Sequence, residues 1–402
     1  MKLPSAPWNQ SNSLKQLIAA LDPSNEKIRF VGGAVRDTLL GIPVRDIDLA
    51  TSLEPGEVIA LLKAAAIKAI PTGIDHGTIT AVTQDGPVEI TTLRRDVSTD
   101  GRRATVRFTS DWKEDAARRD FTINALSADP ETLEVFDYFN GLADLEARQI
   151  RFIGSAADRI AEDHLRIMRY FRFLARFGQD RVEHEAYGAC IAAAASLKSL
   201  SRERIADELM KLLGTENPAF AVGKMLDAGI FGHIFSETDG NASAILERLL
   251  ERERECDIPP FALRRLVALL PKDGDKALKI VTLLRFSKKM RRAVTDRLAE
   301  AQPDPQNILA LAYRHGAQAA SDMILLFAND QDVAASLSKL QDWEKPVLPL
   351  TGGDLVTMGL QRGPIVAETL SKVEEAWIKK GFPGEGEALE LARLLVREAS
   401  AR

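Results

Sequence analysis

The pattern of apolar and polar residues changes near residue 150. Before that point, strand-like runs alternate with stretches whose apolar residues recur at helical spacing. The strand-like runs lie at 27–33, 45–51, 76–83, 87–93 and 133–139. Helical patterns occupy 34–41 and 54–67 between them. The sequence therefore predicts a domain of mixed α and β structure over residues 1–150.

After residue 150 almost every stretch has helical spacing, beginning with a long amphipathic pattern over 157–178. Prolines mark the expected breaks at 218, 259–260, 271, 303–305 and 346–349. No fixed-period repeat and no low-complexity segment occurs. We expect an α+β head followed by a long all-α region.

Composition limits the possible classes of protein. Apolar residues make up 45% of the 402 residues and charged residues 28%, which is typical of a folded globular chain. The 53 basic and 58 acidic residues leave a net charge of −5, which excludes a generally polybasic nucleic-acid binder but not a local basic groove. Two cysteines are too few for a disulfide framework or a four-thiolate zinc site. We find neither a signal peptide nor an apolar run long enough to span a membrane, so we expect a cytoplasmic protein.

The first candidate site is the turn between the predicted strand at 27–33 and the helix that follows. Gly32 and Gly33 would let the backbone approach a phosphate closely, and the helix start would offer unpaired N–H groups. Arg36, one turn further on, could add a forked contact to phosphate oxygens. The spacing fits neither a Walker loop nor a dinucleotide fingerprint, and a simple tight turn is the alternative.

Asp46 and Asp48 form the second candidate site. Residues two apart on a strand share a face, and two neighbouring carboxylates repel each other unless a cation lies between them. Their hard oxygen atoms suit Mg²⁺ bridged to a nucleoside triphosphate, and a solvated strand edge is the alternative. Glu89 becomes a possible third catalytic carboxylate if its strand lies beside that of Asp48.

A third constellation begins with Arg118 and Arg119 and continues with Asp120 and Asn124. On a helix Asp120 and Asn124 would share a face. The two arginines suit a polyphosphate, and the Asp–Asn pair suits ribose hydroxyls. An ordinary charged helix start is the alternative.

The fourth constellation follows Glu162 within the 157–178 pattern. Arg166, Arg169 and Arg172 would share one arc of a helix, opposite an apolar face. Because no acids interleave them, we expect this arc to bind anions, although a solvated basic stripe is the alternative. Asp163 borders the arc about one turn before Arg166, and an Asp–Arg pair offers the acceptor and donor that a base edge requires.

Two further basic groups are less specific. Arg94–Asp96 and Asp100–Arg103 fall in a segment that we expect to form a loop over the site. Lys288, Lys289, Arg291 and Arg292 cluster on a later helix, for which a solvated face is the better interpretation although phosphate contact is possible.

These constellations, in this order, resemble the bacterial–eukaryotic class of the tRNA nucleotidyltransferase/poly(A) polymerase family. The segments that carry the resemblance are VGGAVRDTLLG, RDIDLAT, HGTITAV, EITTLRRD, DGRR, DAARRDFTINAL, FDYFNGLADL and RIAEDHLRIMRYFRF, within about 28–177. A looser likeness continues through SRERIADELMKLL at 201–213 and GGDLVTMGLQRGPIVAETL at 352–370.

The resemblance implies a polymerase-β-like nucleotidyltransferase head with a mixed sheet, followed by a helical neck, body and tail. We expect the head at 1–150, the neck with the base-recognition helix at 151–215, the body at 216–345 and a tRNA-binding tail at 346–402. It implies Mg²⁺ binding by Asp46 and Asp48. The positions it assigns to the nucleotide are Gly32, Gly33, Arg36, Arg118, Arg119, Asp120, Asn124, Asp163, Arg166, Arg169 and Arg172.

The implied activity is the addition of C, C and A to the 3′ end of tRNA from CTP and ATP without a nucleic-acid template. Partial enzymes that add only CC or only A, and a poly(A) polymerase, are the alternatives within the family. HGTITAV favours the CCA-adding branch, and the segment 96–108 favours a complete enzyme. A non-catalytic RNA-binding protein with a relic head is the alternative from a different class. An enzyme that adenylylates small molecules is disfavoured, because the long helical region suggests a large substrate.

Overall fold

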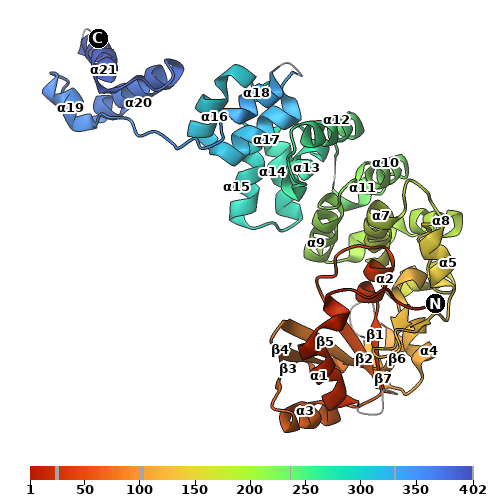
Figure 1. The fold of residues 1–402 in the computed structure, drawn as a ribbon. Helices are drawn as coiled ribbons and strands as arrows, with labels where there is room; N and C mark the ends of the chain where they lie inside the picture. Colours follow the sequence, from red (N-terminus) through yellow and green to blue (C-terminus); the bar gives the residue numbers. More distant parts are fainter. Residues whose placement is uncertain (23–26, 100–103, 236, 330–331, 401–402) are drawn as a thin grey trace. The chain divides into compact units, whose positions relative to one another are not determined.

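A computed structural model describes the chain except for residues 23–26, 100–103, 236, 330–331 and 401–402. The chain divides into two compact units, Met1–Ser236 and Glu237–Arg402 (Figure 1). Each unit has its own secondary structure and core, and we describe them separately. The finer division into head, neck, body and tail stays a prediction.

The first unit contains a mixed seven-stranded sheet in the order β3-β4-β5-β2-β1-β8-β9. Only β2 and β5 pair in parallel, and all other neighbours are antiparallel. The strands are β1 (Ile28–Val31), β2 (Asp48–Thr51), β3 (Lys68–Gly73), β4 (Thr78–Thr83), β5 (Gly86–Thr92), β8 (Ser127–Ala128) and β9 (Val135–Phe136). The mixed-sheet head expected from the sequence is confirmed.

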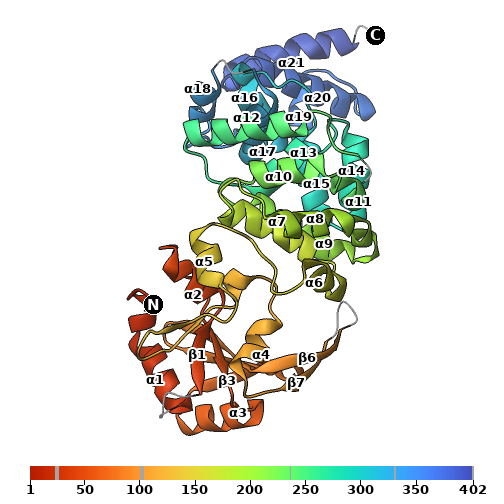
Figure 2. The ribbon, with the colours of Figure 1, turned by 90° about the vertical axis from the view of Figure 1, so that its right-hand side faces the viewer.

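Two helices, α1 (Asn12–Leu21) and α3 (Pro55–Ala64), contact each other and the β3–β4 side of the sheet (Figures 1 and 2). A capping box between Glu54 and Glu57 starts α3. In β5 burial alternates as the period-two pattern predicts, with Val88 and Ile90 buried, whereas three consecutive residues of β4, Thr80 among them, are buried.

The turn after β1 forms as predicted. Gly32 adopts φ = 65°, a conformation that glycine reaches without steric cost, and α2 (Gly33–Leu39) starts directly after it. A Cβ on Gly32 would lie 3.0 Å from Nη1 of Arg119, so a side chain there would also require this guanidinium to shift.

The segment expected to form a loop over the site is instead a two-stranded antiparallel ribbon. It consists of β6 (Arg94–Thr99) and β7 (Ala104–Phe108), visible in Figure 2. The runs RRDVST and ATVRF contain the β-branched residues Val and Thr, a strand signal that the sequence analysis overlooked. The expected Asp100–Arg103 turn lies outside the described residues.

Residues 118–126 do not form the expected helix. Helix α4 (Trp112–Ala117) ends before them, Phe121 is extended, and a single 3₁₀ turn covers Thr122–Asn124. The expected strand at 133–139 shortens to β9, after which α5 (Gly141–Glu146) begins.

The long pattern at 157–178 forms two helices, not one. Helix α6 (Ala156–Glu162) ends at Asp163, whose backbone is extended, and α7 (Arg166–Phe177) begins three residues later. The apolar side of α7 is buried as expected, with Ile167, Met168 and Phe171 inaccessible to solvent. The remaining helices of the first unit are α8 (His184–Ala192), α9 (Arg202–Leu213), α10 (Ala219–Asp227) and α11 (Phe231–Ile234).

Helices make up the second unit within its described residues. They are α12 (Ala242–Glu255), α13 (Ala262–Leu269), α14 (Gly274–Leu283), α15 (Lys288–Arg297), α16 (Ile308–His315), α17 (Ala317–Phe327), α18 (Val333–Ser338), α19 (Gly352–Thr357), α20 (Pro364–Lys379) and α21 (Glu385–Ser400). Trp377 of α20 packs against Tyr313 and Phe382, joining the last three helices to α16. No helix among the described residues is long and apolar enough to cross a membrane.

Candidate active site

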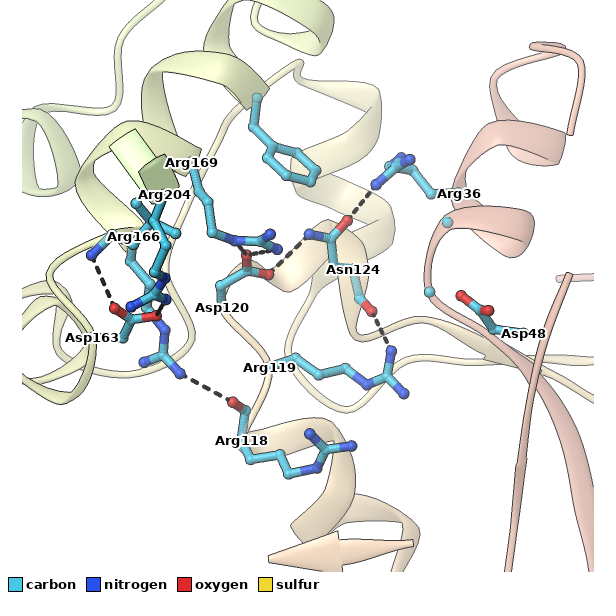
Figure 3. Close-up of a pocket in the computed structure, with 14 residues that line it drawn as sticks. Arg36, Asp48, Arg118, Arg119, Asp120, Asn124, Asp163, Arg166, Arg169 and Arg204 are labelled. Atoms are coloured by element: carbon cyan, nitrogen blue, oxygen red, sulfur yellow. Dashed lines mark hydrogen bonds and ion pairs between the residues drawn. The ribbon is translucent and has the colours of Figure 1, made fainter. Parts of the chain in front are cut away.

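A cavity of about 460 Å³ opens in the first unit between the sheet, the 118–126 segment and α7 (Figure 3). Its lining residues are Gly32, Gly33, Arg36, Asp48, Arg118, Arg119, Asp120, Asn124, Asp163, Leu165, Arg166, Arg169, Phe173 and Arg204. All but three of these belong to the constellations singled out in the sequence. The tertiary structure thus brings segments that are up to about 170 residues apart in sequence to one place.

Three expected site residues do not line this cavity. Asp46 and Arg172 line a neighbouring cavity of about 760 Å³, which also has Asp48 and Arg36 in its wall. Glu89 lines neither cavity, but it lies directly beside Asp48 in the sheet.

The carboxylates meet where β2 pairs with β5. Asp48 is the register partner of Glu89, so the two side chains share one face of the sheet. Asp46 lies just before β2, where the ladder continues through a hydrogen bond from the Glu89 N–H to the Ile47 carbonyl. Burial raises the pKa of the Asp48 carboxyl, and the negative charges of Glu89 and Asp46 raise it further. The condition for Glu89 as a third carboxylate, a strand beside that of Asp48, is therefore met.

This concentration of negative charge fits a divalent cation. Within the described residues, no three His, Cys, Asp or Glu side chains are placed to hold a metal ion by themselves. Mg²⁺, however, is commonly bound by one or two carboxylates together with substrate phosphates and water. Asp46 and Asp48 supply that donor set, and a cation between them would relieve the repulsion that raises the pKa of Asp48.

Arg36 is held firmly and is only 5% exposed. Its Nε donates to Asp37 over 2.8 Å, and Nη1 donates to the side-chain oxygen of Asn124. Burial lowers the pKa of the guanidinium, and Asp37 offsets part of that effect. The guanidinium also lies over the ring of Phe177, 4.3 Å from its centroid. Arg36 therefore presents a fixed positive charge behind the glycine turn.

Arg118 and Arg119 share one buried carboxylate, that of Asp115 in α4. Arg118 Nε lies 2.9 Å from Asp115 Oδ1, and Arg119 Nη2 lies 3.2 Å from Oδ2. Asp115 also accepts a hydrogen bond from the backbone N–H of Arg94, at the base of the ribbon. Burial would raise the pKa of Asp115, but the two arginines outweigh it and lower that pKa. Asp115, which the sequence analysis missed, fixes both arginines at the cavity wall.

Asp120 and Asn124 meet although no helix joins them. The Asn124 amide donates to Asp120 Oδ1 over 2.9 Å across the 3₁₀ turn, and Asp120 Oδ2 accepts from Arg169 (Figure 3). Burial would raise the pKa of Asp120, but the Arg169 ion pair and the hydrogen bonds lower it. A continuous chain of contacts thus runs from Arg36 through Asn124 and Asp120 to Arg169.

The far end of the cavity carries the candidate base-reading group. Arg166 pairs with Glu162 at 2.5 Å and not with Asp163. Asp163 instead accepts from Arg204 Nη2 over 2.8 Å and from the Leu165 N–H over 3.1 Å. The two helices α6 and α7 place Asp163 and Arg166 on the same wall, but the partner that orients Asp163 comes from α9.

No acids interleave the α7 arginines in the sequence, but the fold brings a carboxylate to each of them. Arg166, Arg169 and Arg172 each pair with a carboxylate: Glu162, Asp120 and Glu208, respectively. All three acids lie outside α7, and Asp120 and Glu208 lie outside the whole 157–178 pattern. Arg204 and Glu208 are four apart on α9, so their shared face was a signal in the sequence that could have indicated this contact.

The comparisons with known proteins agree with this geometry. Residues 28–151 match the Poly A polymerase head domain, and residues 181–241 match the probable RNA and SrmB-binding site of polymerase A. The mitochondrial CCA tRNA nucleotidyltransferase 1 of Mus musculus is 34% identical over 97% of this chain and 92% of its own length. The CCA-adding enzyme of Levilactobacillus brevis is 32% identical over 94% of this chain and 96% of its own.

A solved structure shows the same similarity along nearly the whole chain. The crystal structure of the CCA-adding enzyme of Bacillus stearothermophilus in complex with CTP has a TM-score of 0.77 and 26% identity, covering 99% of both chains. The likeness therefore includes the sheet that carries the carboxylates and the helices that line the cavity. On this evidence the chain belongs to the CCA-adding family of tRNA nucleotidyltransferases.

Proposed function

We propose that this protein completes the 3′ end of tRNA by adding C, C and A from CTP and ATP. The observation that carries the proposal is one cavity with three kinds of lining residue. Asp48 lies at one part of it, Arg118 and Arg119 at a second, and Asp163, Arg166 and Arg204 at a third. These three parts match what a nucleoside triphosphate requires: a metal-binding edge, cations for phosphates, and paired donor and acceptor groups for a base. The names of the relatives support the same substrates.

The reaction transfers a nucleotidyl group. The RNA 3′-oxygen attacks the α-phosphorus in line, the bond to the β-phosphate oxygen breaks, and pyrophosphate leaves as the hydroxyl proton is lost. Nucleotidyltransferases of this family use a divalent metal, and we assign Mg²⁺ to Asp46 and Asp48, where it would stabilise the charge on the attacking and leaving oxygens. We assign to Glu89 the role of a third carboxylate beside them.

The arginines bind and orient the substrate. Arg118 and Arg119, held by Asp115, face the phosphates, while Arg36 supplies a fixed charge behind Gly32 and Gly33. The Asp120–Asn124 pair faces the ribose and positions Arg169. Arg172, which faces the adjoining cavity, is a further nucleotide contact.

We attribute base selection to the order of hydrogen-bond donors and acceptors on the edge of the base. Cytosine offers an N4 donor beside the N3 acceptor, and adenine offers N6 beside N1. Asp163 accepts from the exocyclic amine, and Arg166 donates to the ring nitrogen. Uracil and guanine reverse this polarity and would leave buried groups unpaired, at a cost of about 1–3 kcal/mol each.

The test uses a tRNA transcript that lacks its terminal CCA. Purified protein is incubated with Mg²⁺ and labelled CTP or ATP, singly and together, and the products are sized on a denaturing gel. Growth by three nucleotides with both substrates establishes CCA addition. Growth by two that stops there indicates a CC-adding enzyme, and growth only on RNA ending in CC indicates an A-adding one.

Two other results would contradict the proposal more deeply. A long ladder with ATP alone indicates a poly(A) polymerase. No growth under any condition favours the non-catalytic RNA-binding alternative. The cytoplasmic location stays a prediction, because the relatives include a mitochondrial enzyme of mouse.

A further inference from the structure

The neighbouring cavity of about 760 Å³, which we call the second cavity, adjoins the candidate active site within the first unit. It shares Gly33 and Asp48 with the first cavity, and it alone has Asp46 in its wall. Asp163 and Arg166, to which we assign base selection, line only the first cavity. The two cavities therefore meet at the carboxylate edge of the sheet, and the base end of the nucleotide site belongs to the first of them.

The geometry of the proposed reaction gives the second cavity a role. In-line attack places the RNA 3′-oxygen on the far side of the α-phosphate from the leaving pyrophosphate. Asp46 and Asp48, which we assign to the metal, must lie next to both of these oxygens. The RNA end therefore has to lie beside the two carboxylates but outside the space that the nucleotide fills. The second cavity meets both conditions.

Arg172 of α7 lines this second cavity with part of its guanidinium unused. Its Nε donates to Glu208 Oε2 over 2.6 Å. Neither of its Nη atoms forms a hydrogen bond with any residue that the structure describes. The side chain is only 17% exposed, and its guanidinium lies over the ring of Phe173, 4.6 Å from the centroid. A fixed guanidinium with two unengaged nitrogen atoms suits the paired oxygens of a phosphate.

Glu208 of α9 holds two cations of the same wall. Its side chain is 5% exposed, and while Oε2 accepts from Arg172, Oε1 lies 3.5 Å from Nζ of Lys211. Arg172 and Lys211 both line the second cavity, and neither lines the first. Glu208 itself lines neither cavity. It can therefore affect a ligand in the second cavity only through the two cations that it holds.

An ion pair that merely joined two helices would leave no donors over. Arg264 of the second unit provides the comparison, because its Nε, Nη1 and Nη2 all donate to protein acceptors. Arg172 donates through Nε alone and borders a cavity. The pair between Arg172 and Glu208 thus orients a cation toward open space as well as joining α7 to α9.

We propose that Glu208 is a positioning residue, which holds Arg172 so that its Nη atoms bind the last phosphate of the RNA while the 3′-oxygen attacks. That phosphodiester has one negative charge and two non-bridging oxygens, which the two Nη atoms can contact together. Lys211 adds a second positive charge to the same wall. The inference rests on the proposed function, because it takes an RNA 3′ end as the occupant of the second cavity.

The test is a double-mutant cycle of Glu208→Gln, Arg172→Gln and the double variant, assayed with a tRNA transcript that ends in CC and with ATP. We expect Glu208→Gln to raise the KM for the tRNA about ten-fold, the size of one charge-assisted hydrogen bond, and to leave the KM for ATP within about two-fold. Because Glu208 acts through Arg172, the double variant should lose no more than Arg172→Gln alone.

Glu253→Gln is the matched control for the loss of a buried carboxylate. Glu253 also pairs with two arginines and its side chain is 3% exposed, but it lines neither cavity. We expect this variant to melt at a lower temperature with both KM values unchanged. A structural role for Glu208 would give the same result, so the KM for the tRNA separates positioning from stability.

Lys211→Gln tests the same wall if Glu208→Gln does not fold. Its side chain is 52% exposed, so its loss leaves the core intact, and we expect the KM for the tRNA to rise about three-fold. Lys224→Gln is the control for this variant. Lys224 also lies three residues from an acidic partner, Asp227, but it lines neither cavity, and its substitution should change neither KM.

Several outcomes would overturn the assignment. A KM for the tRNA that is unchanged in Glu208→Gln, or raised equally in Glu253→Gln, would leave Glu208 with a structural role only. Additive losses in the double variant would show that Glu208 does not act through Arg172, and a rise confined to the KM for ATP would place the nucleotide in the second cavity.

The proposed function can fail separately from this inference. If the unmodified protein extends no RNA, the proposed function is wrong. The dissociation constant of the tRNA that ends in CC is then compared between the unmodified protein and Glu208→Gln. Binding about ten-fold weaker in the variant would still support an RNA end in the second cavity, and equal binding would overturn the inference as well.

Discussion

Each of the two units contains a network of arginines and carboxylates, and the two networks differ in what surrounds them. In the second unit Arg264, Arg265 and Arg297 pair with Glu253 and Asp322, with all five side chains at most 5% exposed. In the first unit five arginines at the cavity keep between 12% and 33% of their side chains exposed: Arg118, Arg119, Arg166, Arg169 and Arg204. Arg36, behind the glycine turn, is as buried as the arginines of the second unit.

The difference separates a structural role from a binding role. Arg264 is held on all sides, by Glu253, by Asp322 at 2.8 Å and by the Pro259 carbonyl at 2.8 Å. The five partly exposed cavity arginines are held on one side by Asp115, Asp120, Glu162 or Asp163 and line the cavity on the other. An arginine–carboxylate ion pair thus joins helices where protein encloses it. Where it borders a cavity, it holds the arginine in a fixed orientation toward the cavity. Access to the cavity, and not pairing, distinguishes the two networks.

The largest expected effect is on activity. Asp48→Asn removes one of the two carboxylates assigned to the metal, and we expect nucleotide addition to fall roughly 10³-fold, about 4 kcal/mol of transition-state stabilisation. The fold should survive, because the substitution relieves the repulsion that raises the pKa of Asp48. Single-turnover incorporation and a thermal melt measure the two effects. Activity within ten-fold of the original would remove the metal assignment.

The second prediction concerns the enclosed network. Asp322→Asn leaves Arg264 and Arg297 without a shared carboxylate, and we expect a loss of about 3–5 kcal/mol in the free energy of unfolding, measured by urea denaturation. Asp207→Asn, which breaks the exposed pair with Lys211, is the control and should cost less than about 1 kcal/mol. Equal effects of the two substitutions would contradict the distinction between the networks.

The third prediction is that nucleotide selection and nucleotide binding depend on different residues of the cavity. Arg204→Gln removes the partner that orients Asp163, and we expect discrimination of CTP and ATP against UTP to fall about ten-fold. Asp115→Asn loosens Arg118 and Arg119 and should raise the KM for CTP and ATP equally, leaving selection unchanged. If both variants change only discrimination, or both change only the KM, then base selection and phosphate binding do not depend on separate residues of the cavity.

The smallest expected effect is on pH dependence. A raised pKa means that Asp48 keeps its proton to a higher pH than an ordinary aspartate, so metal-dependent activity should decline earlier as the pH falls. Glu89→Gln removes one of the neighbouring charges that raise this pKa. The acid limb of the pH–rate profile should then move to lower pH. Glu146→Gln, on the exposed side of α5, is the control, and a limb that does not move would exclude coupling between Glu89 and Asp48.

Local pattern was sufficient for much of the fold. The period-two runs predicted β4 and β5, and the run that ends in Gly32–Gly33 predicted β1 and the turn into α2, because strand alternation and positive φ are properties of short segments. Local pattern gave the wrong secondary structure in two segments whose side chains contact other elements of the fold. The segment 118–126 has helical spacing but forms a 3₁₀ turn. Asp163 interrupts a continuous helical pattern, and its carboxylate accepts a hydrogen bond from Arg204 on another helix.

The sequence by itself determined which residues could form the site, since the chemistry of Asp46, Asp48, Arg118, Arg119 and Asp163 is set by residue type and spacing. Only the tertiary structure decided how their charges are balanced. Asp115, Arg204 and Glu208 lie on other elements or beyond a turn, and no periodicity in α7 reveals that they hold its arginines and their neighbours. The physical reason is that ion pairs form between side chains that the fold brings within about 4 Å, and that distance depends on packing across the chain rather than on order along it.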